Sequence, residues 1–330
     1  MAADPRRSPS ARPPPENQVQ TVAQAPPAAA AGASSDAHAR VVAFMRGFSA
    51  ETTPGGDAKI DDYRAHLPGG TTVAITHLPG ADYRDSARVA ARLRREGFEP
   101  APHIAARSLG GERELNDFLA RLTGEAGARQ AVALAGAVVA PLGPYDSSLA
   151  LLETGLFDKH GITRIGVAGH PEGNPDIGDA MLAEALRLKN DFAARTDAKL
   201  HLVTQFAFEA APMLAWARAI NQAGNALPIH AGIPGPATLK TLIHYARACG
   251  IGASMRFLTR QARHVAKLLA LNTPDKLLLD LAAAGPDSGI VRAHFYPLGG
   301  MRRTAHFARE LAAGRFTVAG DALHLRDPLP

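Results

Sequence analysis

The stretch "TRIGVAGHPEGNPDIGDAMLAEALRLKNDFAARTDAKLHLVTQFAF", residues 163–208, places a long amphipathic segment between two short apolar runs. The runs at 163–170 and 199–208 have the length and continuous apolar character of strands that are buried on both faces. Residues 180–197 between them carry apolar side chains at helical spacing. A strand, a helix and a second strand in this order are typical of a parallel sheet covered by helices.

The same alternation continues in both directions along the chain. Further strands are expected at 71–78, 100–108, 130–136, 227–235 and 288–298, with a weaker one at 47–53, and helical patterns occupy 85–97, 112–125 and 211–224. A doubly wound open sheet would give the same alternation, but no G-x-G-x-x-G phosphate-binding fingerprint follows the first strands. Eight strand–helix units therefore favour an α/β fold of the (β/α)8 TIM-barrel type.

Two segments stand outside this pattern. Residues 1–37 are rich in Pro, Ala and Ser and hold few large apolar side chains, so we expect a disordered tail. Folding is expected to begin near Ala37, with 38–330 forming one barrel domain. Residues 251–287 have a mostly helical pattern and are expected to be an elaboration before the last strand.

Composition excludes several classes of protein. The net charge of the 330 residues is +5 with scattered basic side chains, and aromatic residues make up 5%, so a nucleic-acid platform is not expected. Cys249 is the only cysteine, which excludes an internal disulfide and a multi-cysteine metal site, and its helical context predicts a buried thiol. No apolar stretch approaches the ~20 residues that cross a bilayer, and no signal-peptide core is present. We expect a cytoplasmic protein with no membrane partner.

Polar residues gather where the predicted strands end, which is where barrel enzymes place their chemistry. They are Glu51, Thr76, His77, His103, His170, Glu172, Asn174, Asp176, Gln205, His230, His294 and Tyr296. Several of the histidines could meet around a divalent ion, as in a metal-dependent barrel lyase or hydrolase. However, no H-x-H, H-x-x-x-H or H-E-x-x-H pair is present, and we assign no metal ligand.

The turn "HPEGNPD" (170–176) holds more polar chemistry than a connection needs. One interpretation is that Asp176 or Asp179 caps the following helix. The other is that the turn holds a ligand, and the two are compatible.

Several segments resemble the methylenetetrahydrofolate reductase family. "HPEGNPD", followed by Lys189 in the next helix, is similar to the family's Y-P-E-x-H-P-E segment. "TQFAFE" (204–209) is similar to T-Q-F-F-F-D, and "PIHAGIPG" (228–235) is similar to P-I-x-x-G-I-x-P. Looser matches are "FSAETTP" (48–54) with S-F-E-F-F-P-P, "APHIAARS" (101–108) with A-P-H-L-T, and "HFYPLGG" (294–300) with H-F-Y-T-L-N. The resemblance covers about 37–300, in the family's order.

This resemblance implies a flavoprotein barrel of one-carbon and methionine metabolism. The family reduces 5,10-methylenetetrahydrofolate to 5-methyltetrahydrofolate with FAD and NADH or NADPH. We expect folate and a nicotinamide as small-molecule substrates, a homo-oligomer, and the catalytic barrel alone, as in short bacterial members.

The resemblance also implies roles for individual residues. Glu51 matches the general acid that protonates N10 of the folate, a role suited to a carboxyl whose pKa is raised in a dry site. Gln205 matches a glutamine that contacts the folate ring and the nicotinamide in turn. The matching flavin-binding positions are Thr76, His103, Tyr145, His170, Glu172, Asn174, Asp176 and Lys189. The expected substrate-binding positions are Gln205, Phe206, Phe208 and Tyr296; Phe206 and Phe208 alternate in direction with Gln205, so at least one belongs to the core.

The chain departs from the family pattern inside the site. Ala137 stands where the family has an aspartate near the flavin, Ala135 replaces an arginine, and Asn174 replaces a histidine. At the end of the last strand, "PLGG" (297–300) lacks the arginine that the family has near the folate tail, although Arg302 and Arg303 follow closely. A folate- or flavin-binding barrel with lost or flavin-independent activity is therefore the alternative.

Overall fold

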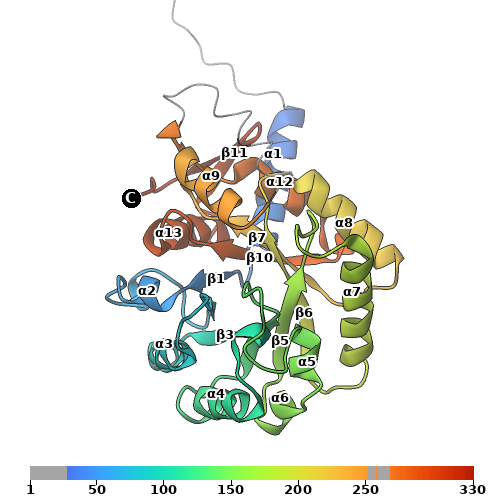
Figure 1. The fold of residues 1–330 in the computed structure, drawn as a ribbon. Helices are drawn as coiled ribbons and strands as arrows, with labels where there is room; N and C mark the ends of the chain where they lie inside the picture. The colour runs from blue at the N-terminus through green and yellow to red at the C-terminus, as the bar shows by residue number, and fades with distance from the viewer. Residues whose placement is uncertain (1–27, 252–257, 259–267) are drawn as a thin grey trace, which may run out of the picture.

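Parallel pairing joins each strand of the central sheet to the next in the chain and closes it into a barrel. The computed structural model describes residues 28–251, 258 and 268–330. Within them the barrel order is β1-β10-β7-β6-β5-β4-β3-β2, which confirms the (β/α)8 prediction (Figure 1). The strands are β1 (Ser49–Thr52), β2 (Thr72–Ile75), β3 (Glu99–Ala105), β4 (Gln130–Leu134), β5 (Arg164–Gly169), β6 (Lys199–Phe206), β7 (Ile229–Pro234) and β10 (Ile290–Tyr296). Each lies within a range expected from the sequence or within one residue of it, including the weak first strand.

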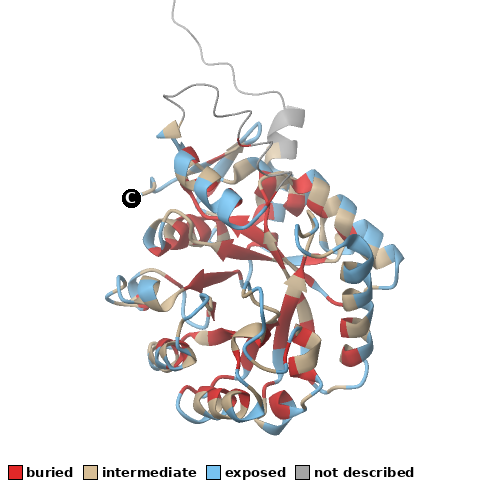
Figure 2. Ribbon diagram, viewed as in Figure 1, coloured by how far each residue is buried: buried red, intermediate tan, exposed pale blue. Residues whose placement is uncertain are grey.

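Helices surround this barrel and turn one apolar face toward it. Figure 2 shows the strands largely buried and the outer faces of the helices exposed. The helices are α1 (Ala28–Phe44), α2 (Pro54–Asp57), α3 (Tyr83–Arg95), α4 (Glu112–Gly124), α5 (Ser148–Leu152), α6 (Leu156–Lys159), α7 (Asp179–Ala193), α8 (Ala210–Gln222), α9 (Leu239–Ala248), α12 (Asp275–Ala284) and α13 (Met301–Ala312). In α3 the Asp82 side chain caps the helix, and Val89, Ala90 and Leu93 form its buried face.

The periphery differs from what the sequence predicted. Helix α1 begins at Ala28, within the stretch expected to be disordered, and it packs against α12. A hairpin of β11 (Phe316–Ala319) and β12 (Ala322–Leu325) follows α13 and was not predicted. In the stretch 251–287, α12 is helical as expected, whereas β9 (Leu271–Asn272) pairs with β8 (Ala237–Thr238), and residues 252–257 and 259–267 lie outside the described residues.

The main core lies between the barrel and the helices, whereas small side chains line part of the barrel interior. Ala74, Ala101 and Val132, with Leu134 packed against them, form a separate small apolar cluster. On β5 the residue paired with Val132 is Gly166, which has no side chain. A Cβ added there would lie 3.2 Å from the side chain of Val132. Barrels of this type usually fill their interior with bulky branched residues. The small residues here leave room for polar side chains on the barrel axis.

Gly232 on β7 allows β6 to approach closely beside the barrel mouth. A Cβ here would lie 2.6 Å from the carbonyl oxygen of Thr204 and 2.7 Å from the carbonyl carbon of Gln205. Because both contacts are backbone, β6 and β7 must separate to admit a methyl group. We expect Gly232→Ala to lower the free energy of unfolding by about 1–3 kcal/mol in urea titrations. Gly55→Ala is the control, since nothing lies within 4 Å of its Cβ, and an equal loss in both variants would contradict the argument.

Candidate active site

Glu51 on β1 is the centre of a polar group at the carboxyl ends of the strands. The residue is only 6% exposed. Its Oε1 lies 3.1 Å from Nε2 of His294 and 3.4 Å from Nε2 of His103, and its Oε2 accepts a hydrogen bond of 2.7 Å from the Thr76 hydroxyl. These partners come from β10, β3 and the end of β2, so closure of the barrel brings together residues that are far apart in the sequence.

The surroundings of Glu51 stabilise its ionised form. Burial alone would raise the pKa of the carboxyl, but the hydrogen bonds and charges of His103 and His294 outweigh burial and hold this pKa well below its usual range. The expected raised pKa is therefore wrong for this arrangement, because two imidazoles face the carboxylate.

His294 lies between Glu51 and Ser49 and is hydrogen-bonded to both. Its Nδ1 is hydrogen-bonded at 2.8 Å to the hydroxyl of Ser49, while its Nε2 faces Glu51. Both His294 and Ser49 are buried. The two bonds fix the orientation of the imidazole ring, so His294 is a positioning residue for Glu51.

Aromatic rings form one side of the mouth beside His294. The ring centroid of Tyr296 lies 5.2 Å from that of His294 and 5.3 Å from that of Phe206, and Phe208 follows at 5.7 Å from Phe206. Phe206 is 1% exposed, and Phe208 is partly buried against a satellite apolar cluster. Burial, with the charges of Glu51 and Cys249, raises the pKa of Tyr296 well above its usual value, and its hydroxyl donates to the carbonyl of Thr204 at 2.9 Å.

Gln205 lies on β6 next to a break in the strand register. The pairing of β6 with β7 shifts between Val203 and Phe206. The Gln205 side-chain oxygen accepts a 3.1 Å hydrogen bond from the backbone N–H of Phe206. The side-chain amide of Gln205 therefore folds back onto its own strand, and the residue is half-buried.

A buried cation lies at the end of β5. Lys189 on α7 is 6% exposed, and its Nζ donates to the carbonyl of Ala168 at 3.0 Å. Burial lowers the pKa of Lys189 to about 8. Burial and the charge of Lys189 lower the pKa of His170 to about 4, which keeps that imidazole neutral. Within the described residues, the bonded partner of this ammonium is a carbonyl, and a buried ammonium of this kind is well suited to an anionic ligand.

The turn after β5 is ordered by its own side chains and does not cap α7 with a carboxylate. The Asn174 side chain accepts a 2.8 Å bond from the backbone N–H of Asp176. The residue at the cap position is Gly178, with no side-chain bond, so the expectation that Asp176 or Asp179 caps the helix is wrong. Asp179 lies in the first turn, Asp176 is exposed, and Glu172 is half-buried with an interaction of its own.

Tyr145 and Ala137 both lie on the segment between β4 and α5. Tyr145 is 8% exposed and belongs to the main hydrophobic core, and burial together with the charge of Glu112 raises its pKa. Ala137 is exposed, on the same loop as Val139, which is 93% exposed. This loop therefore presents apolar side chains where the resembling family has a carboxylate.

His77 is a residue whose role the sequence left open. It follows β2, and its buried Nε2 has no hydrogen-bond partner. Burial, and then the charge of His103, lower its pKa. The signal in the sequence was only its place beside Thr76.

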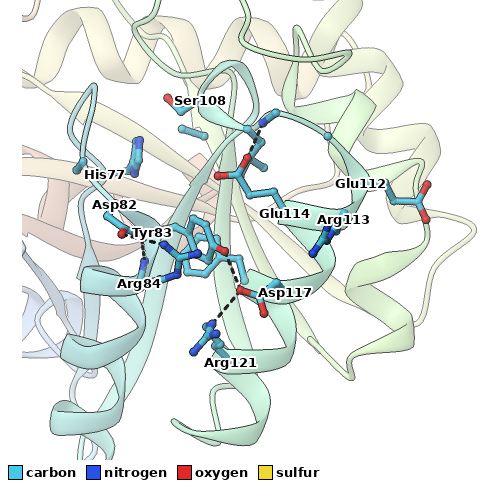
Figure 3. Close-up of a pocket in the computed structure, with 16 residues that line it drawn as sticks. His77, Asp82, Tyr83, Arg84, Ser108, Glu112, Arg113, Glu114, Asp117 and Arg121 are labelled. Atoms are coloured by element: carbon cyan, nitrogen blue, oxygen red, sulfur yellow. Dashed lines mark hydrogen bonds and ion pairs between the residues drawn. The ribbon is translucent and has the colours of Figure 1, made fainter.

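His77 lines a cavity of about 700 Å³ between the amino-terminal ends of α3 and α4. Figure 3 shows His77 and Ser108 on one side of this cavity and Tyr83, Asp117 and Arg121 on the other. The Asp117 carboxylate accepts from the Tyr83 hydroxyl at 2.7 Å and from Arg121 at 2.9 Å. The volume is that of a small-molecule site.

The remaining histidines of the strands lie at a different level from Glu51. His230 on β7 stacks on His201 of β6, with ring centroids 4.1 Å apart, on the amino-terminal side of the barrel interior. Across the part of the chain that the structure describes, the strand-end histidines therefore do not gather into a three-ligand set.

The described residues do hold one group with suitable ligand spacing, formed by His306 and Glu310 of α13 with Asp327. The Nε and Nη2 atoms of Arg315 already donate to the two carboxylate oxygens of Glu310, at 2.9 and 2.6 Å. The group is therefore explained by ion pairing within the protein.

Cys249 ends α9 and is exposed, so the expected buried thiol is wrong. The residue follows the last helical position of α9, Ala248. Partial burial of the sulfur and the charge of Glu51 raise the pKa of the thiol, which places Cys249 within electrostatic range of the site.

Comparison with known proteins supports the fold. No protein-family model matches the chain. The structure of an uncharacterized protein from Clostridium thermocellum that binds two copies of 5-methyl-5,6,7,8-tetrahydrofolic acid is similar, with a TM-score of 0.50 and 12% identity over 80% of this chain and 94% of that one. A proposed lyase/mutase from Burkholderia cenocepacia J2315 has a TM-score of 0.34 and 15% identity over 84% of each chain, a likeness that carries no argument. Among the described helices, none combines the length and apolar character that a bilayer crossing requires.

Proposed function

We propose that this barrel reduces 5,10-methylenetetrahydrofolate to 5-methyltetrahydrofolate, with FAD as the redox cofactor and NADH or NADPH as the hydride donor. The observation that carries the proposal is the buried Glu51, held by His103, His294 and Thr76 at the position where the resembling family has its general acid. The similar barrel from Clostridium thermocellum binds the product of this reaction, which supports a folate ligand.

The Glu51 group would supply the proton that opens the folate ring. A general acid contributes most when its proton is available near the operating pH. Because His103 and His294 stabilise the Glu51 carboxylate, the donor is the hydrogen-bonded group as a whole. His294 is held by Ser49, so the proton is presented in a fixed direction.

The aromatic side of the mouth would hold the flat part of the substrate. Tyr296 packs edge-on against His294, Phe208 packs edge-on against Phe206, and Gln205 lies on the same strand as Phe206. The cavity at His77 would receive the part of a ligand that extends beyond the strand ends.

The residues at the end of β5 fit FAD. Lys189 is a buried cation with no carboxylate on it in the described structure, and it would bind a phosphate oxygen of the cofactor. Asn174 and His170 would contact the polar chain next to that phosphate. When bound, FAD would supply the two-electron redox chemistry between the nicotinamide and the folate.

A binding protein without turnover is the second candidate. It is favoured by Ala137, which leaves the loop after β4 without the carboxylate that the family uses beside its flavin.

The visible absorption spectrum of the purified chain, with and without added FAD, separates the two candidates. Flavin bands that bleach with a nicotinamide and recover with methylenetetrahydrofolate would establish the reductase. A protein that binds methyltetrahydrofolate but shows neither step would be the non-catalytic barrel.

Lys189→Gln is expected to weaken FAD binding by roughly 10- to 150-fold, because a hydrogen bond to a charged group contributes about 1.5–3 kcal/mol. Titration of the apoprotein with FAD, followed by flavin fluorescence, measures the change. Lys240→Gln is the control, since Lys240 is exposed on α9. Equal affinity in both variants would remove Lys189 from the cofactor site.

A further inference from the structure

A second cavity lies inside the barrel, at the amino-terminal ends of the strands and so opposite to the mouth. Its volume is about 220 Å³. The polar side chains that line it are Ser49, Thr72, Gln130, Arg164, Lys199, His201, His230, Arg292 and His294. They come from β1, β2, β4, β5, β6, β7 and β10, so nearly every strand contributes.

The lining contains cationic and neutral side chains and no carboxylate. In the described part of the chain, no ion pair joins Arg164, Lys199 or Arg292 to an acidic residue. Burial, and then the charge of Arg164, lower the pKa of Arg292. Three cations that share a cavity without a counter-ion repel each other, and an anion between them would remove this cost.

Neutral donors complete the site. Gln130 is 6% exposed, and its buried Nε2 has no hydrogen-bond partner. An unpaired buried amide costs about 1–3 kcal/mol, so an acceptor in the cavity would stabilise it. The stacked rings of His201 and His230 add further nitrogen atoms, and burial lowers their pKa values to about 4 and about 2.

The size and position of the cavity select the ligand. At roughly 30 Å³ per water molecule, the volume holds about seven waters. Drug-sized ligands occupy about 300–1,000 Å³, so folate and FAD do not fit. Arg164 and Lys199 are exposed at the rim, so a small anion has access from the solvent.

We propose that the barrel binds a small oxyanion of the phosphate class in this cavity, between Arg292, Gln130 and the His201–His230 pair. The tetrahedral oxygens would accept hydrogen bonds from the Arg292 guanidinium and the Gln130 amide. The inference does not depend on the folate reaction, because Arg292, Gln130, His201 and His230 have no assigned part in that reaction.

Isothermal titration of the full chain with inorganic phosphate, at constant ionic strength, tests the site. We expect one saturable site, and a loss of affinity of about 10-fold or more in Arg292→Gln. Arg129→Gln is the control, because Arg129 is exposed next to the start of β4 and does not line the cavity. Absence of saturable binding, or equal weakening in both variants, would overturn the proposal.

Gln130→Leu provides a second test that leaves the charge unchanged. It removes the unpaired amide from a buried position of similar size, and we expect several-fold weaker phosphate binding with a folded protein. Unchanged affinity in this variant would contradict the assignment. Glycerol phosphate as a second ligand distinguishes the source of the anion, because tighter binding than inorganic phosphate indicates an organic phosphate that extends past Arg164 and Lys199. Weaker binding indicates the free ion.

Discussion

Glu51→Gln is expected to lower the rate of folate reduction by about 10²- to 10⁴-fold while leaving reduction of the flavin by the nicotinamide unchanged. The amide keeps the size of the carboxyl and can still contact Thr76 and the imidazoles. It cannot take part in proton transfer, so only the half-reaction that consumes a proton should suffer. Stopped-flow absorbance of each half-reaction gives the two rates separately.

The comparison needs a control carboxylate and a test of folding. Glu184→Gln, on the exposed face of α7, should leave both rates unchanged. If Glu51→Gln slows both half-reactions equally, Glu51 holds the barrel mouth together and is not the acid. An unchanged folate rate would contradict its role directly.

We expect mild acid to lower the free energy of unfolding. The loss should begin at a higher pH than the one at which carboxylates titrate. Burial is the first cause that lowers the pKa values of His170, His201 and His230, to about 4, 4 and 2, below the unfolded value of about 6.5. The unfolded chain therefore binds more protons than the folded chain below pH 6.5, so stability is fully present above that pH and is lost as the pH falls. Between pH 6.5 and 5.5 the loss is about 1 kcal/mol for each histidine, or about 3 kcal/mol in total.

Urea unfolding at pH 7.5, 6.5 and 5.5, followed by the fluorescence of Trp216, measures this dependence. His201→Gln should remove about 1 kcal/mol of it, whereas His324→Gln, on the exposed hairpin, should remove none. A free energy of unfolding that does not change between pH 6.5 and 5.5 would show that these imidazoles are protonated in the folded protein.

The order of strands and helices was predictable because it depends on local patterns. Continuous apolar runs such as 163–170 and amphipathic segments such as 85–97 fix the type of each element from nearby residues. The weak strand at 47–53 has no such signal, and its pairing with β2 and β10 stabilises it. Long-range pairing of this kind is not visible in a short window.

The site was predictable as a set of residue types and not as an arrangement. Glu51 and His103 were expected at strand ends, but the direction of the Glu51 pKa depends on which imidazoles face it across the barrel. The cap of α7 at Gly178 depends on the path of the preceding turn. The interior cavity depends on Ala74 and Ala101 facing inward together, which only the register of β2 and β3 reveals.

The single exposed cysteine gives this protein a built-in attachment point for a reporter group. A thiol-reactive fluorophore would attach at Cys249 alone, with no substitution needed, because the sequence contains no other thiol. The raised pKa of the thiol means that the labelling reaction runs faster in mildly alkaline buffer. The charge of Cys249 contributes to the raised pKa of Tyr296, so the dye would lie near the aromatic side of the mouth. Its fluorescence would then report the binding of colourless ligands.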